Sequence, residues 1–305
     1  MMKQRSESLE LLMLRSLYAR MDLGAQTEQY YMNLEKGYEG ELIFDEWMKP
    51  LFDGGRIFLN DLLLECNNTL FQIDSFMLTS TTLYLFEIKN YEGDFIIEEE
   101  RWYSAAKKEM KNPLLQLRRN ESLLRQLLQE HRITYPIESY LVFVHPEFTL
   151  YQAPLNLPII HPNQLKRFIT KLNKKPTKLK DTHSKLAEKL LSLHLPESPY
   201  TRLPEYNYAS LQKGIPCPHC QTFYTSFASR KTFLCTSCGW TENIIAAVLR
   251  NIEEFTRLFP DKKITTETIY DWCNEICSKK VIWTVLSKNY KYMGHGRSAY
   301  YVNHD

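Results

Sequence analysis

The stretch FQIDSFMLTSTTLYLFEIKN (residues 71–90) has the pattern of two apolar β-strands joined by a polar turn. It also carries Asp74, Glu87 and Lys89, although an unpaired charge buried in a sheet costs several kcal/mol. Two carboxylates and an amine among apolar neighbours therefore need a chemical reason.

A two-residue turn at Ser80 and Thr81 would pair the two strands so that Asp74 lies opposite Glu87. Strand alternation then places Glu87 and Lys89 on one face of the sheet. Leu83 and Leu85 share that face, and the other face takes Tyr84, Phe86 and Ile88. The turn lacks an Asn-Gly pair that would fix it, so this register is a prediction for the structure to test.

Two opposed carboxylates repel each other, and a hard divalent cation such as Mg²⁺ or Mn²⁺ would bridge Asp74 and Glu87 through oxygen ligands. Lys89 would then position or deprotonate an attacking water, or stabilise a pentacovalent phosphate. The alternative is an internal ion pair between carboxylate and lysine that has no chemical role.

The composition is that of a globular protein: 305 residues allow about two domains, and 44% of the residues are hydrophobic. In the first 22 residues, Glu10, Arg15 and Arg20 interrupt the apolar positions, which predicts neither a secretion signal nor a membrane span. We therefore expect a soluble, cytoplasmic protein without a membrane partner.

Charge is distributed unevenly along the chain. Lys and Arg number 8 against 19 Asp and Glu in residues 1–100, 17 against 8 in residues 101–200, and 13 against 9 in residues 201–305. The acidic part could hold a divalent cation, and the basic parts could bind a polyanion, of which nucleic acid is the obvious one. The alternative for the lysine-rich residues 171–189 is a solvated helix or linker.

Helical and strand patterns alternate in a definite order. Helical spacing is seen over residues 7–20 and 35–52, and Asn112-Pro113 has the N-cap and first-turn residues of a third helix. Apolar strand patterns besides the opening stretch lie at 56–65, 94–99, 139–144 and 157–160, and further helices are expected from about 163 and 183. This order predicts an α/β fold with a mostly antiparallel, mixed sheet between helices.

The chain also resembles a known family. Asp followed by Glu-x-Lys on the next strand resembles the signature of the PD-(D/E)xK, or restriction-endonuclease-like, nuclease superfamily. Four blocks in order, GYEGE (37–41), FQIDSFMLT (71–79), YLFEIKNYEGDF (84–95) and NPLLQ (112–116), are similar to those of the nuclease-related domain family, NERD. The resemblance implies a restriction-endonuclease-like sheet flanked by helices over about residues 30–145.

The resemblance further implies a catalytic set from several segments of the chain: Glu41, Asp74, Glu87, Lys89 and Gln116. Within that set, the implied Mg²⁺ or Mn²⁺ ligands are Asp74, Glu87 and Glu41. Without the family resemblance, Glu41 would be interpreted as a surface glutamate and Gln116 as an amide on a helix surface. The Glu-Ile-Lys triplet is intact, so the sequence shows no lost catalytic residue.

The segment CPHCQTFYTSFASRKTFLCTSCGW contains two Cys-x-x-Cys pairs separated by fourteen residues: Cys217, Cys220, Cys235 and Cys238. Two close pairs around an aromatic-rich hairpin are what a tetrahedral zinc ribbon requires. Four cysteine ligands leave no open coordination position, so this Zn²⁺ would be structural. The alternative is a redox role for the cysteines.

Three helical patterns and an aromatic hairpin with glycines follow the cysteines, and they resemble a winged helix-turn-helix. The candidate nucleic-acid-binding residues lie on its recognition helix and wing: Lys279, Lys280, Lys288, Lys291 and Arg297. The alternative is a helical cap or dimer module with incidental lysines, and a homo-oligomer is considered for this reason. A zinc-ribbon tail behind the nuclease-like domain also resembles members of the same family.

These patterns divide the chain into five segments, since residues 195–216 carry four prolines and no clear periodicity. They are an N-terminal helical extension (1–30), the nuclease-related domain (31–195), a linker (196–212), the zinc ribbon (213–242) and a winged-helix-like domain (243–305).

The function that we expect is metal-dependent hydrolysis of phosphodiester bonds in DNA, with the ribbon and the tail binding the substrate. The alternatives are a non-catalytic nucleic-acid-binding or regulatory protein that keeps the nuclease fold, and a protein-interaction module that contacts an acidic partner. An intact catalytic set favours the first, and absence of divalent-metal binding near Asp74 would favour the others.

Overall fold

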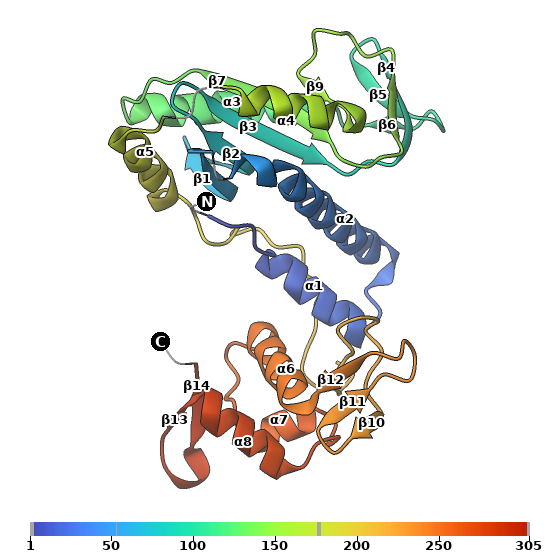
Figure 1. Cartoon of the computed structure of the whole chain (residues 1–305). Coiled ribbons are helices and arrows are strands. Elements are labelled where there is room, and N and C mark those ends of the chain that lie inside the picture. The colour runs from blue at the N-terminus through green and yellow to red at the C-terminus, as the bar shows by residue number, and fades with distance from the viewer. Residues whose placement is uncertain (1–2, 53, 176–177, 304–305) are drawn as a thin grey trace. The chain divides into compact units, whose positions relative to one another are not determined.

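The computed structural model describes residues 3–52, 54–175 and 178–303 (Figure 1). It divides into two compact units. The first comprises residues up to Ser8 and Met32–Tyr200, and the second comprises Leu9–Tyr31 and the chain from Thr201 onward. The boundary near the N-terminus falls within helix α2 (Gly24–Met48). The five segments expected from the sequence stay a prediction.

A five-stranded mixed sheet forms the centre of the first unit, with the strand order β1-β2-β3-β7-β9. Its strands are β1 (Ile57–Cys66), β2 (Thr69–Leu78), β3 (Leu83–Lys89), β7 (Ile137–Phe143) and β9 (Ile159–Ile160). The pairs β1–β2 and β2–β3 are antiparallel, whereas β3, β7 and β9 run parallel.

The register predicted for the β2–β3 hairpin is confirmed. Met77 pairs with Tyr84 and Ser75 with Phe86, and the Thr79 amide donates to the Thr82 carbonyl at 3.0 Å. The turn thus consists of two residues, Ser80 and Thr81, as their polarity between two apolar strands indicates.

Helices cover both faces of this sheet, and each face has its own apolar core. On one face, leucines of α3 (Pro113–Glu130) and α5 (Asp181–Ser192) pack with Leu83 and Leu85 of β3. On the other, α2 and α4 (Leu165–Asn173) pack against Tyr84, Phe86 and Ile88. The predicted alternation of faces along β3 is therefore confirmed.

Helix α3 begins where the sequence predicts. The Asn112 side chain accepts a hydrogen bond from the Leu114 amide at 2.9 Å, and Pro113 occupies the first turn. Its leucines at helical spacing then face the sheet, with Leu117 and Leu124 buried. This packing fixes the helix whose first turns reach the charged end of β3.

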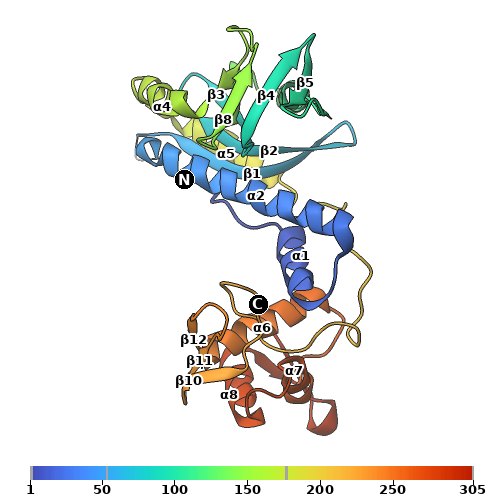
Figure 2. The same ribbon diagram turned by 90° about the vertical axis from the view of Figure 1, so that its right-hand side faces the viewer.

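Three of the four strands in a second sheet were missed from the sequence. This sheet has the order β6-β5-β4-β8 and lies beside the first in Figure 2. Its strands are β4 (Gly93–Glu98), β5 (Arg101–Ser104), β6 (Glu109–Met110) and β8 (Phe148–Tyr151). The missed strands, β5, β6 and β8, are four residues or shorter, too short to show an alternating pattern.

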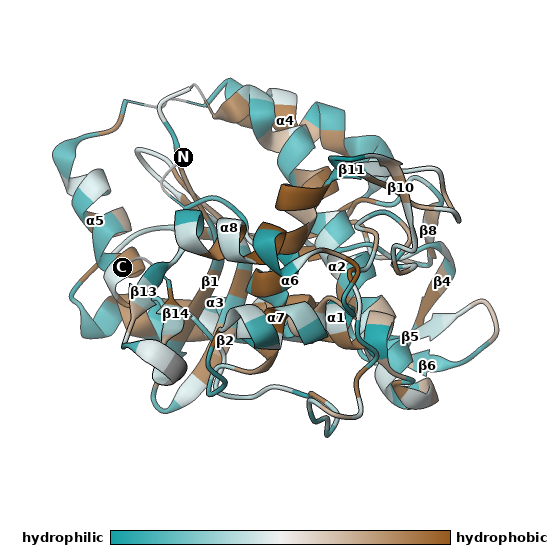
Figure 3. Cartoon of the chain, turned by 90° about the horizontal axis from the view of Figure 1, so that it is seen from below, coloured by the Kyte–Doolittle hydropathy of each residue, from teal (hydrophilic) through white to brown (hydrophobic). Residues whose placement is uncertain are grey.

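The second unit contains α1 (Leu9–Arg20), α6 (Ile244–Leu258), α7 (Thr266–Trp272) and α8 (Lys279–Asn289). It also holds a three-stranded sheet, β10 (Ser226–Ser229), β11 (Thr232–Leu234) and β12 (Thr241–Asn243), and a hairpin of β13 (Lys291–Met293) and β14 (Tyr300–Val302). The apolar start of α6 is brown in Figure 3 and is buried at Ala247 and Val248.

Arg20 ties α1 to this unit. Its guanidinium donates to the carbonyls of Gln212 (2.7 Å) and Gly214 (3.0 Å) and to the Asn251 side chain (2.8 Å), and pairs with Glu254. A buried arginine with this many acceptors is satisfied, so it fixes α1 against the C-terminal helices.

The fold class predicted from the sequence is confirmed: mixed sheets flanked by helices, a four-cysteine region and a helical C-terminal part. Within residues 3–52, 54–175 and 178–303, no helix has both the length and the apolar character needed to cross a bilayer.

Candidate active site

The charged end of β3 meets helix α3. The Lys89 ammonium lies 2.7 Å from Glu87 Oε1 and 3.4 Å from Gln116 Oε1. Asn120, one turn after Gln116, donates to Glu87 Oε2 at 3.3 Å and to the Gln72 carbonyl at 2.8 Å. The structure therefore brings together three of the residues predicted from the sequence, and it adds Asn120 as a partner of Glu87.

Asp74 enters the site because β2 and β3 stop pairing at this point. The last paired residues on this side are Ser75 and Phe86, so the register sets Asp74 level with Glu87. One Asp74 oxygen, Oδ2, accepts a hydrogen bond from the Ile88 amide at 2.8 Å. This bond fixes the Asp74 carboxylate against the backbone of β3, next to the Glu87 side chain.

Glu41 is positioned by close contact between α2 and the end of β3. A Cβ built on Gly40 would lie 2.5 Å from Cβ of Asn90, so only glycine permits this approach. The Asn90 side chain also donates to the Lys36 carbonyl at 2.8 Å. Gly40, the second glycine of the GYEGE block, therefore has a structural reason, which is to let α2 carry Glu41 to the sheet.

Three residues near Glu41 were missed from the sequence: Arg5, Asp45 and Asp61. Arg5 lies 2.8 Å from Glu41 and 2.9 Å from Asp45, and it also contacts Asp61. The pairs on either side, Asn60–Ser75 and Leu62–Ile73, set Asp61 level with Asp74 across β1 and β2. Asp61 has a φ of 53°, a left-handed value that an aspartate adopts at some cost.

Burial and the nearby Asp74 weaken the acidity of Glu41 and Glu87. Burial, and next the neighbouring Asp74, raise the pKa of Glu87 and that of Glu41 to about 8 each. Burial also raises the pKa of Asp74, against the opposing effect of Lys89. Burial alone would lower the pKa of Lys89, but Glu87 and Asp74 outweigh it and raise that pKa to about 12.

This chemistry fits a divalent cation. Clustered carboxyl groups that hold protons near neutral pH gain a favourable partner when a cation takes the place of those protons. Asp74, Glu87 and Glu41 offer the hard oxygen ligands that Mg²⁺ and Mn²⁺ prefer. Across the described ranges, however, only the four cysteines set three or more candidate ligand atoms within 4.8 Å of one another, so no three of these carboxylates come that close together.

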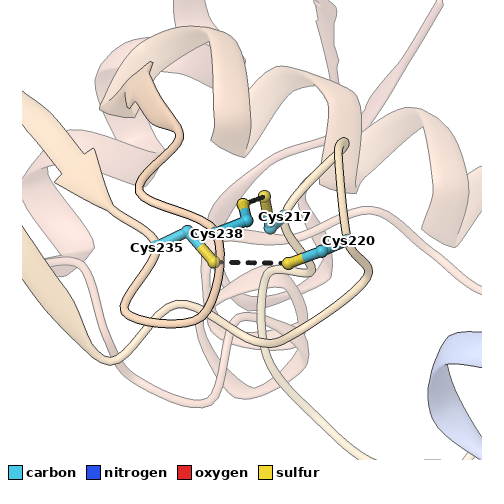
Figure 4. Close-up of side chains that lie close together, drawn as sticks. All are labelled: Cys217, Cys220, Cys235 and Cys238. Atoms are coloured by element: carbon cyan, nitrogen blue, oxygen red, sulfur yellow. Dashed lines mark hydrogen bonds between the residues drawn. The ribbon is translucent and has the colours of Figure 1, made fainter.

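The four cysteines come together on loops of the second unit, where Cys235 directly follows β11 (Figure 4). The sulfurs of Cys217 and Cys238 are 3.7 Å apart, and those of Cys220 and Cys235 are 3.4 Å apart. All four sulfurs lie within 4.8 Å of one another. This cluster is consistent with a zinc ribbon, because a tetrahedral Zn²⁺ needs four converging thiolates.

Each cysteine pair sits in a backbone knuckle. The Gln221 amide donates to the Cys217 carbonyl and the Gly239 amide to the Cys235 carbonyl, both at 2.9 Å. Gly239 has a φ of 74°, which explains the glycine directly after Cys238. Together the two turns aim both thiol pairs at one point, as the Cys-x-x-Cys spacing predicts.

Four of the candidate nucleic-acid-binding residues lie on α8 and β13, and Arg297 lies in the short 3-10 turn Gly296–Ser298. Lys279, Lys280, Lys288 and Lys291 are all exposed, and Lys279 also pairs with Glu267 at 2.6 Å. The Arg297 side chain lies outside the described residues. Trp283, which was missed from the sequence, is 55% exposed one turn after Lys280. An exposed tryptophan between lysines on a helix is a feature that nucleic-acid contacts use.

Comparison with known proteins assigns part of the chain to a family. Residues 36–144 match the nuclease-related domain, NERD. This confirms the resemblance seen in the sequence, and the chain carries a nuclease-related domain over those residues. The match contains every member of the candidate site from Glu41 to Gln116, whereas Arg5 precedes it. Neither the proteins of curated function nor the solved structures include a match.

Proposed function

We propose that the protein is a divalent-metal-dependent nuclease that hydrolyses phosphodiester bonds in DNA, and that the zinc ribbon and C-terminal helices help to bind the substrate. The observation that carries the proposal is the pair of buried carboxyl groups, Asp74 and Glu87, with the Lys89 ammonium 2.7 Å from Glu87, inside a nuclease-related domain. Such a cluster is unfavourable as structure alone, because two carboxylates share one ammonium.

In this proposal Asp74, Glu87 and Glu41 hold the cation. When bound, Mg²⁺ or Mn²⁺ supplies Lewis acidity and lowers the pKa of a water molecule. Lys89 orients that water or stabilises the negative charge that develops on the phosphate. Gln116 keeps the Lys89 ammonium in place, and Asn120 keeps Glu87 turned toward it.

One observation favours a second function, non-catalytic binding of nucleic acid. Lys89 is already paired with Glu87, as it would be in a purely structural ion pair. In that case the fold and the exposed lysines would serve binding only. The two functions differ in whether the protein needs a divalent cation to change its substrate.

Cleavage assays test the proposal. Supercoiled plasmid, linear duplex, single-stranded DNA and RNA are each incubated with Mn²⁺, Mg²⁺ or EDTA. We expect cleavage of DNA with the cations and none with EDTA, and none by Asp74→Asn under any condition. A wild-type protein that binds nucleic acid but cuts neither DNA nor RNA would support the binding-only function.

The contribution of the tail has its own test. Changing Lys280, Lys288 and Lys291 to glutamine is expected to weaken DNA binding for all sequences and to reduce the salt dependence by roughly one unit of log–log slope per lost contact. Lys279→Gln serves as the matched control. This lysine already pairs with Glu267, so its replacement should weaken DNA binding less. An unchanged slope in the triple variant would show that this surface does not contact phosphates.

A further inference from the structure

The N-terminal segment Lys3–Ser6 runs beside β1, the edge strand of the main sheet. The Lys3 amide donates to the Phe58 carbonyl at 3.3 Å, and the Asn60 amide donates to the Lys3 carbonyl at 3.2 Å. The Ser6 amide donates to Asp61 Oδ2 at 3.2 Å. These backbone contacts hold the segment in a defined place, with the Arg5 side chain directed toward α2.

The Arg5 side chain is only 2% exposed, and its charge is shared among three carboxylates. Nε and Nη2 donate to the two oxygens of Asp45 at 2.9 and 3.2 Å. The remaining nitrogen, Nη1, contacts Asp61 and donates to Glu41 Oε2 at 2.8 Å. A fork that grips Asp45 with two bonds and Glu41 with one leaves the Glu41 carboxylate little freedom to turn.

This geometry would allow Arg5 to hold Glu41 in place as a metal ligand. Arg5 contacts Glu41 through Oε2 alone, so it does not take Oε1. The Arg5 charge also acts favourably on both Glu41 and Asp74. Without Arg5, the repulsion among Glu41, Asp45 and Asp61 would lose its main opposing charge, although Lys3 also acts favourably on Asp61.

We propose that Arg5 is a positioning residue of the active site, which fixes the Glu41 carboxylate for cation binding from outside the nuclease-related domain. The inference rests on the proposed function, since it assumes that Glu41 binds the metal. Groups that hold a metal-ligating carboxylate typically change metal affinity 10–100-fold when removed. The matched family segment begins at residue 36, so Arg5 is a contribution of this chain's own N-terminal segment.

A double-mutant cycle tests this role. Mn²⁺ affinity is measured by calorimetry on the full, zinc-loaded chain for the wild type, Arg5→Gln, Glu41→Gln and the double variant. We expect Arg5→Gln to weaken Mn²⁺ binding about tenfold or more. In the Glu41→Gln background the same change should have less than about a twofold effect, because Arg5 would act through Glu41.

Two further variants keep the test decisive. Arg56→Gln is the matched control, since Arg56 is a buried arginine of the same unit that donates to the Leu172 carbonyl at 3.0 Å; it should lower stability and leave Mn²⁺ affinity unchanged. Arg5→Lys, which keeps the charge but not the fork, should bind Mn²⁺ with intermediate affinity. If Arg5→Gln does not fold, Arg5→Lys takes its place in the double-mutant cycle.

Unchanged or tighter Mn²⁺ binding by Arg5→Gln would overturn the inference. So would an equal loss in both backgrounds, because Arg5 would then act independently of Glu41. Either result, with Mn²⁺ still bound by the wild type and weakened by Glu41→Gln, leaves the proposed function standing. A wild type that binds no Mn²⁺ overturns both.

Discussion

Replacing Lys89 with alanine is expected to lower DNA cleavage by about 10² or more while Mn²⁺ and substrate stay bound. The reason is that Lys89 lies beside Glu87 but is not one of the proposed metal ligands. Asp74→Asn should behave differently: it should weaken Mn²⁺ binding and abolish cleavage without unfolding the protein. Asparagine can still accept the hydrogen bond from the Ile88 amide, and the change removes repulsion with Glu87.

Thermal stability measured with and without Mn²⁺, together with plasmid nicking, separates this outcome from a structural ion pair. A structural pair predicts that both substitutions lower the melting temperature by several degrees and that Mn²⁺ changes neither variant. Lys175→Ala is the matched control, since Lys175 pairs with Glu138 at 3.1 Å in the same unit. It should leave cleavage unaffected, and a comparable loss of cleavage there would argue against a special role for Lys89.

Removing one thiolate from the four-cysteine cluster is expected to unfold the zinc ribbon. Structural Zn²⁺ supplies folding free energy, so Cys235→Ser should release the metal and expose residues 212–242 to proteolysis, while the first unit stays folded. Metal analysis should find about one Zn²⁺ per wild-type chain.

Cys277→Ser is the control for this experiment, because Cys277 is buried in the same unit but lies outside the cluster. It should retain zinc. Folded wild-type protein that carries no zinc after careful purification would contradict the zinc-ribbon assignment.

Much of the site could be predicted because local patterns encode it. Alternation along residues 71–90 gives the strands, and a two-residue turn then sets Asp74 level with Glu87. The same holds for the cysteine knuckles, whose ligands are close in sequence. Glu41 and Gln116 were different, since only the resemblance to a family singled them out. For Glu41 the structure shows why: it reaches the site through a contact between distant residues, in which Gly40 lets α2 approach Asn90.

The rest depends on contacts between distant residues. Arg5 meets Glu41 and Asp61 across 36 and 56 residues, and no periodic pattern marks such a pair. In the sequence, Asp61 looks like an interruption in an apolar strand. Its left-handed backbone cannot be inferred from the neighbouring leucines, so its place in the site could not be predicted. Helix α2 begins earlier than predicted because its first turns, GAQTEQYYMN, lack a regular apolar stripe.

In the proposed function a divalent cation binds between Asp74 and Glu87. The most direct test is anomalous diffraction from crystals of the wild-type protein grown with Mn²⁺. We expect a manganese peak coordinated by oxygens of both Asp74 and Glu87, with Glu41 on the same ion directly or through water. Well-ordered carboxylates with no manganese between them, and the Lys89–Glu87 ion pair unchanged, would contradict it.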